Sequence, residues 1–65
     1  MYFSDIVKNK NTSCPHHGSM GVVQKIMNLA NDMGKVVKYR VVNSGPTYSP
    51  GDVLVKTLDQ LESVN

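Results

Sequence analysis

The sequence is poor in several features that mark common classes of small protein. Cys14 is the only cysteine among 65 residues, so no intramolecular disulfide can form, and a reducing compartment is expected. No apolar run reaches the roughly 18 residues that would cross a bilayer. The first residues, Met1 to Asp5, lack the basic and apolar regions of a signal peptide. We therefore expect a protein of the cytoplasm, or of a particle assembled there, with no membrane partner.

Motifs that carry catalysis are missing as well. The chain contains neither a glycine loop of the kind that cradles a phosphate nor a clear pair of catalytic carboxylates. A domain of this size buries only about 60% of the surface that its unfolded chain exposes, which leaves little room for an enclosed pocket. We expect one small domain over residues 1–65, with no enzymatic activity, no cofactor and no small-molecule substrate.

Charge is also scarce. The net charge is +2, from seven Lys and Arg against five Asp and Glu, and so small an excess does not by itself indicate nucleic-acid binding. Its distribution is uneven, because most of the basic residues precede position 41 and most of the acidic ones follow it. Two interpretations stay open, namely a charge-asymmetric binding surface and an ordinary solvated face.

The clearest positive signal is the stretch Lys35–Asn43, which alternates in the manner of a half-buried strand. Val37, Tyr39 and Val41 fall on one face of an extended chain, and Lys38 and Arg40 fall on the other. The stretch is rich in β-branched and aromatic residues, which favour strands. We predict a central core strand with a basic outer side.

The segment before it allows two structures. Val22, Ile26, Leu29 and Met33 have helical spacing, and they would give an amphipathic helix over residues 20–33 that ends at Gly34. Gly21 and the polar residues near the end of the segment are poor helix formers, however. The sequence favours the other structure, a strand at Met20–Met27 that pairs with the central strand as a hairpin.

The rest of the chain indicates short elements between turns. The expected elements are a strand at Tyr2–Lys8, a polar loop at Asn9–Gly18, a loop at Ser44–Asp52, a strand at Val53–Lys56, a helical or 3₁₀ turn at Leu58–Leu61 and a strand at Glu62–Asn65. Pro50-Gly51 predicts a type II turn with the glycine at its third position. Thr57 and Gln60 have the spacing of a capping box at the start of the helical turn.

This order of elements resembles the small SH3-like β-barrels, in which a 3₁₀ turn precedes the last strand. The residues that carry the resemblance are Asp5-Ile6-Val7, Met20–Ile26, Lys35–Val42 and Leu58–Glu62. It implies a mainly β fold of about five short strands. Barrels of this kind are encoded by bacteriophages, so it also implies an accessory or virion-associated phage protein, virion-bound or in the host cytoplasm. The Sm-like barrels are similar more loosely, and their N-terminal helix and RNA-contacting motifs are not matched here.

Two binding hypotheses follow. In the favoured one, the protein is an interaction or structural module that binds a protein partner or a second copy of itself. Its contact residues would be Lys38 and Arg40 on the basic strand face and Tyr48 in the proline-flanked loop. In the alternative, the barrel binds nucleic acid through Lys25, Lys35, Lys38 and Arg40. Tyr48 has a second interpretation, in which its ring covers one end of the barrel.

The run Cys14-Pro15-His16-His17 is the one stretch with metal-ligand chemistry. Adjacent histidines do not easily face the same ion as Cys14, and no second cluster supplies the remaining ligands. An ordinary loop is therefore favoured over a metal site at Cys14, His16 and His17. Thiol catalysis would need a base within hydrogen-bond reach of Cys14 and a group that orients it, which the sequence does not indicate.

Overall fold

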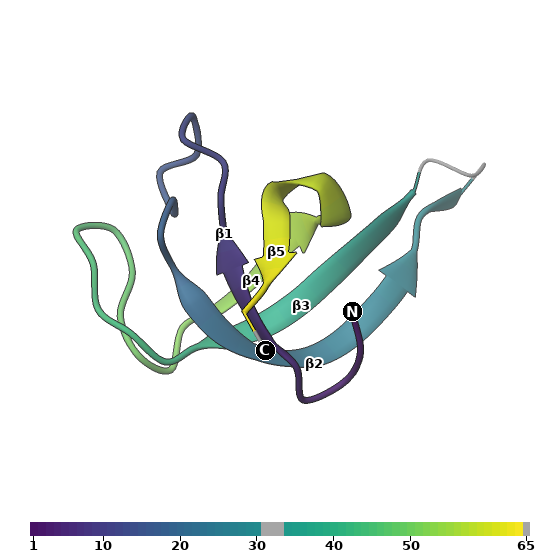
Figure 1. Ribbon diagram of the computed structural model, residues 1–65, viewed down its shortest axis with the longest axis horizontal. Helices are drawn as coiled ribbons and strands as arrows, with labels where there is room; N and C mark the ends of the chain where they lie inside the picture. The colour runs from purple at the N-terminus through teal and green to yellow at the C-terminus, as the bar shows by residue number, and fades with distance from the viewer. Residues whose placement is uncertain (31–33, 65) are drawn as a thin grey trace.

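The computed structural model describes residues 1–30 and 34–64, and these form one antiparallel sheet (Figure 1). Its elements in chain order are β1 Ile6–Asn9, β2 Met20–Asn28, β3 Lys35–Val41, β4 Val53–Thr57, the 3₁₀ turn η2 Leu58–Gln60 and β5 Leu61–Ser63. The strands lie in the order β4-β3-β2-β1-β5, so β4 and β5 are the two edges and η2 connects them. This confirms the predicted small, mainly β fold of five short strands with a 3₁₀ turn before the last strand. The described residues include no helix of the length and hydropathy needed to cross a bilayer.

The hairpin predicted for residues 20–42 is confirmed, and the alternative helix is wrong. β2 and β3 pair over most of their length, from Gly21 opposite Val41 to Asn28 opposite Lys35. Four β-branched or aromatic residues in β3 outweigh the helical spacing of the preceding segment, because each gains a cross-strand neighbour. Met33, which belonged to the predicted helical stripe, lies outside the described residues.

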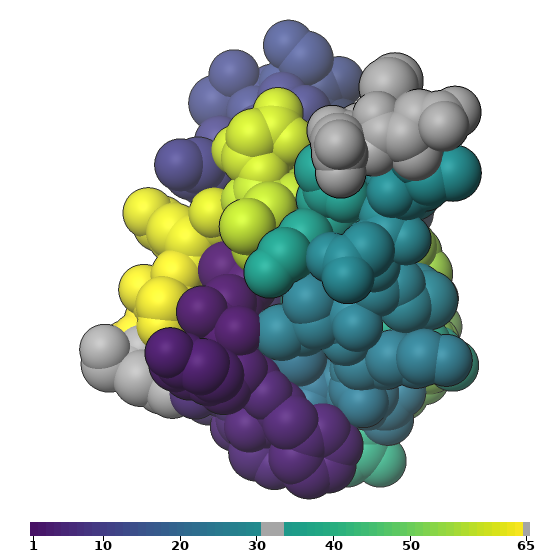
Figure 2. Space-filling model, turned by 90° about the vertical axis from the view of Figure 1, so that its right-hand side faces the viewer, coloured from purple at the N-terminus to yellow at the C-terminus, as the bar shows by residue number. Residues whose placement is uncertain are grey.

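The first strand is shorter than expected at its N-terminal end. Tyr2 to Asp5 form a turn instead, in which the Asp5 amide donates to the Tyr2 carbonyl and the Asp5 carboxylate accepts from the Tyr2 amide at 2.8 Å. Ser4 has a φ of 70° in this turn, and its amide donates to the carbonyl of Val23 in β2. Figure 2 shows the N-terminal segment lying against β2. The local Asx interaction therefore wins over strand propensity at these residues.

The turn predictions near the C-terminus have a mixed outcome. Gly51 has a φ of 95° and the Asp52 amide donates to the Ser49 carbonyl, which confirms the type II turn at Pro50-Gly51. The 3₁₀ turn η2 is confirmed too, but the capping box is wrong. Thr57 stays extended and makes no side-chain cap bond, and Oε1 of Gln60 is buried without a hydrogen-bond partner among the described residues.

Tyr39 is the largest fully buried side chain of the core. The buried apolar side chains are Val7, Val23, Val37, Tyr39, Val41, Tyr48 and Leu61. The Tyr39 hydroxyl is hydrogen-bonded to the hydroxyl of buried Ser19 at 2.7 Å. Burial raises the pKa of Tyr39 above its ordinary value, so the phenol stays neutral in the core.

Gly21 is needed where Tyr39 packs on β2. A Cβ at this position would overlap the carbonyl oxygen of Arg40 and lie 2.6 Å from Cδ2 of Tyr39. We expect Gly21→Ala to lower the free energy of unfolding by about 2–4 kcal/mol, because a close-packed core strand has to shift. Gln24→Ala, at an exposed position of the same strand, should change it by less than about 0.5 kcal/mol. Equal losses in urea denaturation of the two variants would contradict this role of Gly21.

Candidate functional site

Five side chains from three neighbouring strands form what we call the outer face. They are Lys25 of β2, Lys38 and Arg40 of β3, and Val53 and Val55 of β4. The register places Lys25 opposite Lys38, Lys38 opposite Val55, and Arg40 opposite Val53. Val53 and Val55 are 48% and 52% exposed. The outer face is therefore a basic cluster that borders an apolar strip on the edge strand.

A β-bulge places Lys25 in this cluster. Val23 pairs with Tyr39 and Lys25 pairs with Lys38, so β2 has one extra residue, Gln24, against β3. In a regular strand Lys25 would point to the same side as buried Val23. The bulge inverts the alternation, so that Ile26 turns toward the core and Lys25 turns outward.

The cations of the outer face have no neutralising partner within the described part of the chain. No carboxylate of residues 1–30 or 34–64 forms an ion pair with Lys25, Lys38 or Arg40. Side chains directly opposite each other in an antiparallel pair have Cβ atoms about 5 Å apart, and like charges at that separation are destabilising. The site is electrostatically unfavourable by itself, and an anion placed on it would relieve the repulsion.

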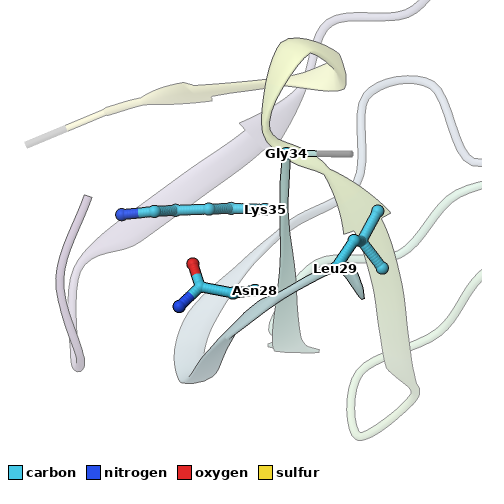
Figure 3. A pocket seen from close by; sticks show the side chains of 4 residues that line it. All are labelled: Asn28, Leu29, Gly34 and Lys35. Atoms are coloured by element: carbon cyan, nitrogen blue, oxygen red, sulfur yellow. The ribbon is translucent and has the colours of Figure 1, made fainter. Parts of the chain in front are cut away.

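Lys35, which the sequence grouped with these cations, lies elsewhere. It pairs with Asn28 at the far end of the hairpin and has the same alternation as Val37, on the opposite side of β3 from Lys38. There it lines a pocket with Asn28, Leu29 and Gly34 (Figure 3). In Figure 3 the side chains of Lys35 and Asn28 point the same way, and Leu29 points away from them. The predicted nucleic-acid set is therefore split, and only three of its four members share a surface.

Tyr48 is not a surface contact, and that interpretation is corrected. Its ring is 8% exposed and belongs to the core, because the loop folds back over the end of the sheet. A Cβ on Gly45 would overlap this ring, so the glycine leaves the space that the ring fills. The loop is also held to residues 10–19, since the Thr47 hydroxyl donates to the Pro15 carbonyl and the Asn43 amide side chain donates to the Gly18 carbonyl. The position of Tyr48 agrees with the second interpretation, in which its ring covers one end of the fold.

Cys14 and His16 meet on the inner side of β4, where Lys56 reaches both. Lys56 Nζ lies 3.3 Å from Cys14 Sγ and 2.8 Å from His16 Nδ1. The sulfur also accepts from the His16 amide at 3.4 Å and from Asn9 Nδ2 at 3.5 Å. The hydrogen bond from the His16 backbone amide lowers the pKa of Cys14 below its ordinary value, and the hydrogen bonds from Asn9 and Lys56 contribute less.

This arrangement is unlike a metal centre or a catalytic pair. The Lys56 ammonium lies against both potential ligand atoms, and His17 is exposed beside the cluster. Within residues 1–30 and 34–64, no three His, Cys, Asp or Glu side chains are grouped to hold a metal ion. The three residues Cys14, His16 and His17 therefore do not converge on one point. The imidazole of His16 is hydrogen-bonded to the lysine instead of acting as a base on the thiol.

Two of these features escaped the sequence analysis although a signal for each was present. Val53 and Val55 alternate with Leu54 and Lys56, which is the pattern of a strand with two different faces. The slip in apolar spacing between Val23 and Ile26 indicates a bulge. The contact between Lys56 and Cys14, which joins residues 42 positions apart, has no local signature.

The repulsion between Lys25 and Lys38 gives a prediction. Lys25→Glu creates an opposite-charge pair across the two strands, and we expect it to raise the free energy of unfolding by about 0.3–1 kcal/mol. The gain should shrink in 1 M salt, where charges more than about 3 Å apart are screened. Lys10→Glu, in a loop beyond β1, gives the same change in net charge. If both variants gain equally in denaturant titrations, the effect is one of net charge and not of this pair.

The lowered pKa of Cys14 gives a second prediction, which concerns the reactivity of its thiol. We expect the rate of alkylation by iodoacetamide, plotted against pH, to have its midpoint below 9.0 in the folded protein. Lys56→Met should move the midpoint upward, and Lys35→Met should leave it unchanged. Between the lowered folded value and the unfolded value, the unfolded chain binds more protons, so stability should rise with pH in this window. Cys14→Ser should lose that rise, and equal midpoints in folded and urea-unfolded protein would contradict the prediction.

Within residues 1–30 and 34–64, the outer face combines cations that lack a carboxylate partner with exposed apolar side chains. Lys25, Lys38 and Arg40 supply the charge, and Val53 and Val55 supply apolar area beside it. No protein-family model, curated protein or solved structure matches the chain.

Proposed function

We propose that this protein is a non-enzymatic interaction module that binds an acidic protein partner through its outer face. The observation that carries the proposal is the cluster of Lys25, Lys38 and Arg40 without a carboxylate partner in the described residues, next to exposed Val53 and Val55. An acidic partner would neutralise the cations and at the same time cover the two valines. The resemblance to small phage barrels suggests an accessory or virion-associated role.

Nucleic acid is the second candidate for the same surface. The close placement of three cations favours it, because phosphates bind to such clusters without sequence preference. Against it, Tyr39 is fully buried and offers no ring for base stacking. A phosphate backbone would also offer no apolar contact to the exposed side chains of Val53 and Val55. The apolar strip is therefore the feature that separates the two candidates, and it favours a protein.

A titration followed by amide NMR spectra tests the proposal. The probes are a flexible acidic peptide, acetyl-Glu-Ser-Glu-Val-Asp-Ser-Glu-amide, and a single-stranded oligonucleotide of equal charge. We expect the peptide to shift the amides of Lys25, Lys38, Arg40, Val53 and Val55 at low ionic strength, and to do so more than the oligonucleotide.

Two charge-reversal variants provide the matched comparison. Lys38→Glu with Arg40→Glu should weaken peptide binding at least about tenfold, since two charged contacts become repulsive. Lys10→Glu with Lys35→Glu has the same net charge but leaves the outer face intact, and it should bind within about twofold of the wild type. Stronger binding of the oligonucleotide would favour the nucleic-acid candidate. Equal losses in both variants would reject the outer face as the site.

A further inference from the structure

The free edge of β4 is the part of the outer face that has unused backbone hydrogen-bonding groups. The Val41 amide donates to Asp52 and the Val42 amide donates to Met20, so alternate residues of β3 bond to β4 and to β2. Tyr39 and Val37 are on the β4 side, opposite Leu54 and Lys56. In an antiparallel ladder these are the pairs that exchange hydrogen bonds. The amide and carbonyl groups of Val53 and Val55 therefore point away from β3, toward the open edge.

The same two residues point their side chains to the outer face. Val53 and Val55 lie opposite Arg40 and Lys38, and a strand added beside β4 would place its own residues opposite these valines. Residues that exchange hydrogen bonds across such a pair have their side chains on the same face of the sheet. Every second side chain of the added strand would thus lie over Val53 and Val55, within reach of the long Lys38 and Arg40 side chains.

We infer that the partner binds as an extended acidic segment, antiparallel to β4, that adds a sixth strand to the sheet. The inference rests on the proposed function and names its binding mode. Charge complementarity decides the occupant, because a second copy of the chain would bring its own Lys38 and Arg40 toward those of the first. An acidic segment with Glu or Asp at alternate positions places its carboxylates beside these cations and satisfies the edge amides and carbonyls of Val53 and Val55.

Backbone methylation of a model peptide tests this geometry directly. The probe is acetyl-(Glu-Val)₃-amide, in which glutamates on the outer face would direct their N–H groups to β4 and the valines would direct theirs to solvent. N-methylation of the three glutamates removes the donors that the edge needs, and we expect binding to weaken by about tenfold or more. N-methylation of the three valines adds the same number of methyl groups on the solvent side, and binding should stay within about threefold. Affinities are read from amide NMR titrations.

A protein variant supplies the matching change on the other partner. Val55→Pro deletes the edge donor of Val55 and leaves the hydrogen bonds of Leu54 and Lys56 to β3 in place. We expect it to keep its spectrum of dispersed amide signals and to lose binding of the unmethylated peptide at least about tenfold. Should this variant fail to fold, the two methylated peptides still decide the question with the wild-type protein.

The outcomes separate the binding mode from the function. If the glutamate-methylated peptide binds as well as the valine-methylated one, strand addition is wrong while acidic binding at the outer face stands. If neither acetyl-(Glu-Val)₃-amide nor the flexible acidic peptide binds at low ionic strength, both strand addition and the proposed function are wrong. If sedimentation shows a dimer that Val55→Pro abolishes, the edge pairs with a second copy, and the acidic segment is rejected as its occupant.

Discussion

The buried ring of Tyr39 is the constraint on which the sheet depends. Its hydroxyl bonds to Ser19 just before β2, and its ring fills the space left by Gly21 within β2. A buried phenol without a partner is costly, so these two contacts fix which side of β3 faces inward. Because side chains alternate along a strand, an inward Tyr39 forces Lys38 and Arg40 outward. The core contact and the basic surface are thus two consequences of one register.

The bulge at Gln24 places the third cation, Lys25, on the same outer side as Lys38 and Arg40. It lets buried Val23 and partly buried Ile26 both face the core, which an unbroken strand cannot do, since these residues have opposite alternation. The same adjustment turns Lys25 outward, opposite Lys38. A pairing of like charges opposes stability and contributes nothing to the core. Local conflicts of this kind, where packing alone would favour another residue, are found chiefly at sites that serve binding.

The elements of the fold were predictable from the sequence because they depend on local alternation. The strand Lys35–Val41 and its hairpin with β2 follow from β-branched and aromatic residues that alternate along the chain. The type II turn follows from Pro50-Gly51. The first strand was overextended because the Asp5 side chain forms a turn that competes with strand pairing. Alternation patterns do not show such competition.

The candidate site was predictable only in part. Lys38 and Arg40 were placed correctly on the outer side of β3, and the same alternation could have excluded Lys35, which points with Val37. Tyr48 was misjudged because its burial depends on Gly45 and on loop contacts across more than 25 residues. Contacts between distant segments leave no periodic trace, so flanking prolines alone did not reveal that the ring is part of the core.

Lys56 shows why the outer cations differ from the other bases of the sheet. It projects from β4 to the inner side, where the sulfur of Cys14 and a ring nitrogen of His16 both accept from its ammonium. The ammonium of this inward lysine therefore has hydrogen-bond partners within the chain. Lys25, Lys38 and Arg40 form no ion pair with any carboxylate of residues 1–30 or 34–64. If a partner binds as proposed and excludes water from Val53 and Val55, salt would screen these cations less, so the attraction to an acidic segment would grow as the apolar contact forms. In the proposed complex, charge and apolar area on the outer face would therefore reinforce each other, although each alone would be a weak site.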